Sequence, residues 1–234
     1  MRTVDSIIKS ATVFYKTLSE DSNGRFRSWE YCYKCFHDAR NNPDADVDYL
    51  CLHLAFYLAS WGMYRGSSFL LQKDYKVHKK VVKEILKPQY DCLFGIKCSK
   101  FRDEEVFNLM MELYRFIENY YGEVRDSVKE VDVKSNPSSV LVTKVLMGTL
   151  GCVPAYDRYF IEGVKSKKVA AGRFGKNSIL SLVDFYEQNE SDLEKARRGL
   201  KVCGLSYPQM KLLDMGFWQI GFDLDQDKGL KKAD

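Results

Sequence analysis

The sequence predicts an all-α protein, a multi-helical globular fold packed around one buried central helix at about residues 48–71. Apolar residues recur at spacings of three and four in one segment after another, which is the period of an amphipathic helix. The run from Tyr49 to Met63 is apolar on nearly every side, as in a helix enclosed by its neighbours. With 234 residues, 45% of them apolar, the chain can form a large core of eight to ten helices.

The central run is not expected to cross a membrane. Spanning a bilayer needs about 20 apolar residues, whereas His53 interrupts this run and Arg65 follows it. The N-terminus lacks the continuous apolar stretch of a secretory signal. The seven scattered cysteines fit thiols kept reduced inside a cell. We therefore expect a cytoplasmic protein with no membrane partner.

Metal binding is not expected either. Cys32 and Cys35 form one C-x-x-C, with His37 close by, and Cys92 and Cys98 are a possible second pair. The second pair has five residues between its cysteines, which departs from the usual zinc-ligand spacing. The cysteines fit small core residues better, so we expect no metal and no cofactor.

In the N-terminal part, residues 1–122, local signals place each helix. Polar turns separate the first helices, Asp46 or Asp48 can cap the central helix, and Pro88 stops the helix that follows it. Ser99, with Glu104 nearby, starts a long helix that Gly122 closes. The predicted helices cover about residues 3–18, 28–40, 48–71, 73–87 and 99–121.

A polar segment at 123–137 is the predicted division from a closely packed C-terminal part, residues 123–222. Ser138 or Ser139 caps the next helix. Residues 223–234 lack a periodic apolar face and are expected to be a disordered tail. The predicted helices here cover about residues 138–150, 157–164, 177–188, 191–202 and 207–221.

The net charge of +4 is unevenly distributed. Residues 73–87 hold six lysines against two acids, and five of these lysines recur on one helical face, here called the lysine helix face. Residues 165–176 form a basic loop without an acid. Such surfaces are most often solvated, but they can also bind phosphate backbones. The candidate anion-binding residues are Lys73, Lys76, Lys80, Lys83, Lys87, Lys167, Lys168, Arg173 and Lys176.

Arg65 needs a partner because an unpaired charge next to an apolar run is costly. That partner is either a carboxylate of the same chain or a phosphate or carboxylate ligand. We expect Arg65 and Asp157 to lie at an interior cleft between the two parts. The other candidate cleft residues are Trp61, Tyr64, Ser68 and Tyr156.

Residues 57–72 read Y-L-A-S-W-G-M-Y-R-G-S-S-F-L-L-Q and precede the lysine-rich helix. This block resembles one in a family of uncharacterised bacterial proteins of similar length, which carries the pattern Y-L-A-S-W-G-M-x-R-G-S-S. The resemblance implies no activity.

Within residues 143–160, one apolar helix ends at Gly151, the chain turns at Pro154, and Asp157 opens the next helix. An aspartate in this place is usually an N-cap. The same order of features resembles the part of the helix-hairpin-helix DNA glycosylases that presents their catalytic aspartate, which implies that role for Asp157. The chain departs from that family where S-N-P-S-S at 135–139 replaces the glycine-rich L-P-G-V-G hairpin. Its Lys144 is not at the family's lysine spacing either.

We therefore expect a protein that binds DNA, RNA or another phosphate-bearing partner through the lysine helix face and the basic loop. One alternative is a DNA-glycosylase-like enzyme with Asp157 as its acid or base. Another is a non-catalytic structural or protein-interaction module in which Arg65 pairs with Asp157. A protein partner or a homo-oligomer is compatible with all three.

Overall fold

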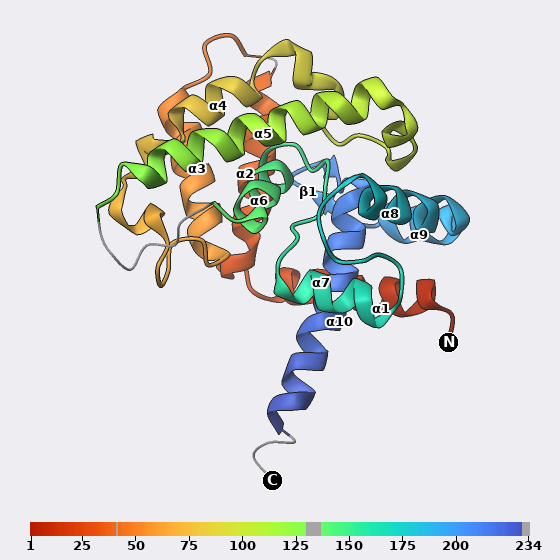
Figure 1. Cartoon of the computed structure of the whole chain (residues 1–234). Helices are drawn as coiled ribbons and strands as arrows, with labels where there is room; N and C mark the ends of the chain where they lie inside the picture. The colour runs from red at the N-terminus through yellow and green to blue at the C-terminus, as the bar shows by residue number, and fades with distance from the viewer. Residues whose placement is uncertain (41, 130–136, 231–234) are drawn as a thin grey trace.

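The computed structural model describes residues 1–40, 42–129 and 137–230 and confirms the all-α prediction (Figure 1). Those residues form ten α-helices, short 3₁₀ helices and one antiparallel hairpin. The α-helices are α1 Thr3–Glu20, α2 Ser28–Arg40, α3 Val47–Ser60, α4 Lys79–Ile85, α5 Glu104–Asp126, α6 Ser139–Thr149, α7 Arg158–Ser166, α8 Lys176–Gln188, α9 Glu190–Arg197 and α10 Gln209–Leu230. The 3₁₀ helices are η1 Arg25–Arg27, η2 Phe69–Gln72, η3 Tyr75–His78, η4 Pro88–Leu93 and η5 Cys98–Arg102, and the hairpin pairs β1 Lys201–Val202 with β2 Leu205–Ser206.

The helix α3 begins as predicted but ends early. Its cap is Asp46, whose carboxylate accepts the N–H groups of Asp48 at 2.9 Å and Tyr49 at 3.2 Å. The helix stops just before Gly62, which adopts a left-handed conformation with φ of 79°. Glycine reaches this region without a steric penalty and so commonly ends helices. Of the helix predicted over residues 48–71, α3 therefore forms only the first part, up to Ser60.

The most enclosed helix is α6, not α3. In α3, Leu54 is buried but Phe56 on the other side is exposed, so enclosure on nearly all sides is wrong for this helix. In α6, every residue over 141–149 is buried. A methyl group on Gly148 would lie 2.3 Å from the ring of Tyr57, so glycine lets α3 pack against α6 at this point.

The lysine-rich segment 73–87 is not one helix. Asp74 accepts the N–H of Lys76 at 2.7 Å and starts the η3 turn, from which α4 continues. Lys73 lies before this turn and Lys87 follows α4, so the predicted single helical face is wrong at both ends. A capping side chain can start a new helix within a periodic run. Its oxygen accepts the first backbone N–H groups of that helix, which have no carbonyl partner in the preceding turn.

The long helix α5 starts at its own cap, since Asp103 accepts the N–H of Glu105 at 2.9 Å. The predicted start at Ser99 is therefore too early. The helix also runs through Gly122 to Asp126, because Gly122 does not adopt the left-handed φ with which a glycine ends a helix. The division near 123–137 stays a prediction, with residues 130–136 outside the described part of the chain.

The last helix, α10, packs closely on α7 and also contacts α1, so both ends of the chain share one layer (Figure 1). A methyl group on Gly163 of α7 would lie 2.0 Å from the carbonyl oxygen of Phe217. One on Gly221 of α10 would lie 1.9 Å from that of Tyr159. The two glycines therefore allow the helix backbones to touch, which a side chain would prevent.

The expectation of a disordered tail over 223–234 is wrong for its described part. The helix α10 continues to Leu230 and extends beyond the other helices in Figure 1. Asp225 accepts from Arg158 at 2.8 Å, and Lys228 lies 3.6 Å from Glu162. These contacts with α7 hold the last part of α10 in place, although this part has no periodic apolar face. Residues 231–234 lie outside the described chain.

His78 is fully buried between two tyrosines. Its Nε2 lies 2.7 Å from the hydroxyl of Tyr64, and its Nδ1 lies 2.6 Å from that of Tyr121. Burial penalises the imidazolium and lowers the pKa of His78 to about 3. The neutral ring therefore ties the loop after α3 to α5.

This pKa predicts acid sensitivity. A depressed pKa means that the contribution of His78 to stability is complete above the unfolded pKa of about 6.5 and declines as pH falls toward 3. At pH 5 the loss is about 2 kcal/mol. Urea unfolding at pH 8 and pH 5 should show this loss, and His78→Gln should reduce it. His53→Gln is the control, and an equal reduction in both variants would contradict the assignment to His78.

Candidate functional site

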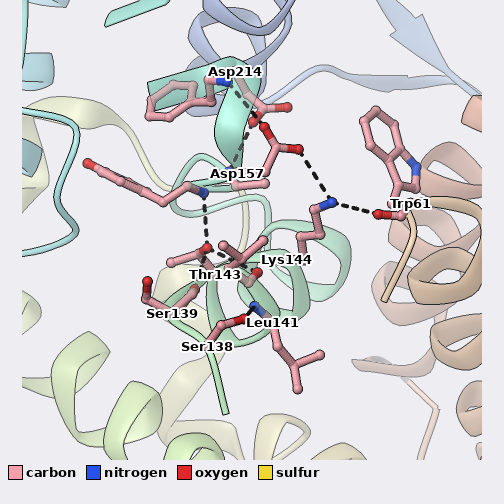
Figure 2. A network of polar contacts seen from close by, with 12 residues as sticks. Trp61, Ser138, Ser139, Leu141, Thr143, Lys144, Asp157 and Asp214 are labelled. Atoms are coloured by element: carbon pink, nitrogen blue, oxygen red, sulfur yellow. Dashed lines mark hydrogen bonds and ion pairs between the residues drawn. The ribbon is translucent and has the colours of Figure 1, made fainter. Parts of the chain in front are cut away.

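Lys144 is a buried amine on α6. Its Nζ donates to the carbonyl oxygen of Trp61 at 2.7 Å and lies 3.4 Å from Oδ2 of Asp157 (Figure 2). Ser138 fixes the start of α6 because its Oγ accepts the N–H of Leu141. Burial lowers the pKa of Lys144, although the nearby Asp157 opposes that shift. The site therefore holds an amine that is easier to deprotonate than an ordinary lysine.

Asp157 is the N-cap of α7, as predicted, and it also has a second contact. Its Oδ1 accepts the N–H of Phe160 at 3.1 Å, while Oδ2 faces Lys144. The loop before it is fixed at two successive amides, since Ala155 donates to Asp214 and Tyr156 to Thr143, each at 3.0 Å. The carboxylate is therefore held by α6 and α7, and the loop that carries it is fixed by α6 and α10 (Figure 2).

A second buried pair lies behind this one. Lys211 Nζ lies 2.8 Å from Oδ2 of Asp214, and both side chains are nearly inaccessible. The ammonium lies 4.7 Å from the ring centre of Trp29 and 5.2 Å from that of Trp61, distances typical of cation–π contacts. Burial raises the pKa of Asp214, and the adjacent Lys211 opposes that shift. Two lysines and two aspartates thus form a compact group around Trp61, in which Asp157 alone is partly exposed.

The first pair lines a pocket of about 630 Å³, here called the aromatic pocket. Its aromatic lining consists of Phe26, Trp61, Tyr159, Trp218 and Phe222, and its charged lining consists of Arg25, Arg65, Lys144, Asp157 and Arg158. Four basic groups against one carboxylate make the lining positive. Such a pocket suits an anionic ligand with a flat ring.

Guanidinium groups and rings adjoin each other on the wall of the pocket. Arg25 lies 4.5 Å from the ring centre of Phe26, and Arg158 lies 4.6 Å from that of Tyr159. Phe26 in turn lies 4.8 Å from Trp61, between ring centres. A smaller pocket of about 240 Å³ adjoins this one and shares Arg65 with it.

The predicted cleft is only partly found. Trp61 and Arg65 line the aromatic pocket, and Ser68 lines the smaller pocket. Tyr64 instead bonds His78, and Tyr156 is buried with its hydroxyl 2.8 Å from that of Ser178. These two hydroxyls are held by core partners.

The suggested pairing of Arg65 with Asp157 is also wrong. The partner of Asp157 is Lys144, and Arg65 has no ion pair among the described residues. Both side chains nevertheless line the same pocket.

The two basic stretches lie apart. Lys80 lies 3.8 Å from Glu123 near one end of α5, and Lys176 lies 3.1 Å from Glu104 at the other end. At about 1.5 Å per residue, these two glutamates are roughly 28 Å apart along the helix. The lysine helix face and the basic loop therefore do not converge on one site, and neither lines the aromatic pocket.

Lys144, Lys211 and Asp214 were not predicted from the sequence as members of a site. The signal that could have found them is a single charge within an apolar helical run, because such a charge must find a partner. Lys211 and Asp214 are also one helical turn apart, which allows pairing within α10. Arg25 and Arg158 gave no comparable signal, since exposed arginines are common on surfaces.

No protein-family model, no curated protein and no solved structure matches the chain. The two resemblances therefore stay predictions. No helix in the described ranges is both long enough and apolar enough to span a membrane. Within the same ranges, no three His, Cys, Asp or Glu residues gather as a metal site would require.

Proposed function

We propose that this protein binds nucleic acid, takes one nucleotide into the aromatic pocket, and acts there on the bond between base and sugar. The observation that carries the proposal is the buried amine of Lys144 beside the carboxylate of Asp157, on the wall of a positive, aromatic-lined pocket. Asp157 is also the residue to which the resemblance to the DNA glycosylases assigns catalysis.

The lining supports binding of a nucleotide. Bases stack on aromatic side chains whatever their sequence, and guanidinium groups match phosphate geometry. Arg25 and Arg65 are exposed and have no ion pair among the described residues, which leaves them available to phosphates. Arg158 already forms an ion pair with Asp225, at 2.8 Å. We therefore assign the first phosphate contacts to Arg25 and Arg65.

The pair supports nucleophilic chemistry. Burial lowers the pKa of Lys144, so the neutral amine, the form that attacks carbon, forms more readily there than in an ordinary lysine. The amine nitrogen attacks C1′ of the sugar while the bond from C1′ to the base breaks. The electron pair leaves with the base, which takes a proton from water, and Asp157 accepts the proton that the amine releases. Asp157 then returns this proton to O4′ as the C1′–O4′ bond breaks and the nitrogen lone pair forms the C=N bond, which leaves a protonated imine between Lys144 and C1′.

Binding should depend on the pocket arginines. In a salt series with a single-stranded oligonucleotide, the double variant R25Q/R65Q should reduce the slope of log affinity against log salt by about 1.4, about 0.7 for each lost phosphate contact. The control is R115Q/R198Q, which removes two exposed arginines that do not line the pocket. Equal slopes for the two double variants would contradict this binding site.

The lysine helix face supports a second candidate function, the binding of a phosphate-bearing partner without chemistry. Lys76 and Lys83 are exposed and have no ion pair among the described residues, whereas Lys80 lies 3.8 Å from Glu123. In the same salt series, the variant K76A/K80A/K83A distinguishes the two surfaces. A loss of slope in this variant, with R25Q/R65Q unchanged, would favour the second candidate over the aromatic pocket.

A further inference from the structure

A second pocket of about 320 Å³ lies between α2, the loop from η4 to η5, and the strand β2. Ligand pockets in proteins commonly measure about 300–1,000 Å³, so its size suits a small molecule. It shares no lining residue with the aromatic pocket or with the smaller pocket beside that one. This hairpin pocket is defined here by Tyr33, Phe94, Gly95, Lys97, Leu205 and Pro208.

The hydroxyl of Tyr33 lies at this pocket without a protein partner. Tyr33 is only 2% exposed, yet its hydroxyl forms no hydrogen bond with any described residue. The rings of Trp29 and Phe94 stack on the Tyr33 ring, with ring centres 5.1 Å and 4.6 Å away, so the ring edge is the part left to line the pocket. A methyl group on Gly95, which also lines the pocket, would lie 3.0 Å from the hydroxyl oxygen. A buried hydroxyl without a partner is costly, so a ligand that accepts its hydrogen bond would be stabilised there.

The charged lining of the hairpin pocket is basic, with no carboxylate among the described residues that line it. Arg197 is already paired with Glu194, at 2.7 Å. His37 likewise faces Asp38, with Nδ1 3.0 Å from Oδ1. Lys97 is exposed and has no ion pair among the described residues. One uncompensated cation is therefore left for a ligand.

We propose that the hairpin pocket binds a small organic monocarboxylate, with a carboxylate oxygen accepting from the Tyr33 hydroxyl and the negative charge close to Lys97. The apolar part of the ligand packs on Leu205 and Pro208. Burial raises the pKa of Tyr33, so its hydroxyl keeps its proton and donates. A single ammonium matches one negative charge, which favours a carboxylate over the dianion of inorganic phosphate. This site does not depend on the proposed function.

Isothermal titration calorimetry with benzoate tests the site. Benzoate should bind the unmodified protein, and Tyr33→Phe, which removes only the hydroxyl, should weaken binding by about tenfold to a hundredfold, as expected for a lost hydrogen bond to a charged group. Lys97→Gln should weaken it as well. The matched control is Lys100→Gln, since Lys100 is also exposed and unpaired among the described residues but does not line the pocket. Benzamide, which has a similar shape but no charge, should bind at least about tenfold more weakly than benzoate.

Three outcomes of the same titrations would overturn the proposal. The first is that neither benzoate nor hexanoate binds the unmodified protein. The second is that benzoate affinity falls in R25Q/R65Q and not in Tyr33→Phe, which would place the ligand in the aromatic pocket. The third is that inorganic phosphate binds more tightly than benzoate, which would exclude a carboxylate as the preferred ligand.

Thermal unfolding separates a ligand contact from a structural role of the Tyr33 hydroxyl. Because no protein partner is lost, Tyr33→Phe should keep the melting temperature of the unmodified protein or raise it. Saturating benzoate should raise the melting temperature of the unmodified protein more than that of the variant, since a ligand stabilises the state that binds it. A lower melting temperature in the variant without benzoate would show that the hydroxyl has a partner within the protein, and would contradict the site.

Discussion

Replacing Lys144 with methionine is expected to abolish the covalent adduct between the protein and a nucleotide sugar. Methionine fills a similar volume but has no amine to attack C1′, so turnover should fall at least about a thousandfold. The proposed adduct is an imine, which borohydride should trap as a stable amine. The measurement is mass spectrometry of the borohydride-treated protein after incubation with oligonucleotide duplexes that carry damaged bases.

Asp157→Asn is the companion variant in this experiment. Asparagine caps a helix as well as aspartate does, so α7 should remain intact while the negative charge is lost. The rate should fall by about 10²–10⁴-fold, the range for loss of a general acid or base. Full activity in this variant would remove Asp157 from the mechanism. A trapped adduct in Lys144→Met would remove the lysine, and no cleavage of any damaged duplex would remove the chemistry altogether.

Breaking the buried pair of Lys211 and Asp214 is expected to produce the largest loss of stability. Lys211→Met leaves an unpaired carboxylate with almost no access to water, and breaking a buried pair in this way costs about 3–5 kcal/mol. The free energy of unfolding in urea measures this loss. The reason is desolvation, because water no longer compensates the charge that remains.

The double variant K211M/D214N provides the control. Asparagine can still accept the N–H of Ala155, and no buried charge is left, so the double variant should be more stable than Lys211→Met alone. A double variant whose loss equals the sum of the two single losses would show that the groups act independently. That outcome would contradict the ion pair.

Local features of the fold were largely predictable from the sequence. Asp46 and Asp157 cap the helices where they were expected to, because a cap satisfies backbone amides two or three residues away. Amphipathic spacing likewise gave the all-α class. Where local signals compete, the prediction failed, as at Asp74, which starts a new turn inside a periodic lysine-rich run.

The candidate site was less predictable because its residues are brought together by packing. Asp157 was identified as a candidate, but its partner was expected to be Arg65. The partner is Lys144 instead. Its helix α6 is enclosed by its neighbours, so the Lys144 amine has few other polar groups within reach. Asp214 arrives from α10, 57 positions along the chain from Asp157.

The sequence by itself determined the helical class and most helix caps, because both depend on hydrogen bonds and apolar spacing within a few residues. Tertiary structure alone decided that α6 is more enclosed than α3 and that α5 separates the two basic stretches. It also decided which lysine meets Asp157. These outcomes depend on which elements exclude water from one another, and a buried charge takes the partner that packing leaves within reach.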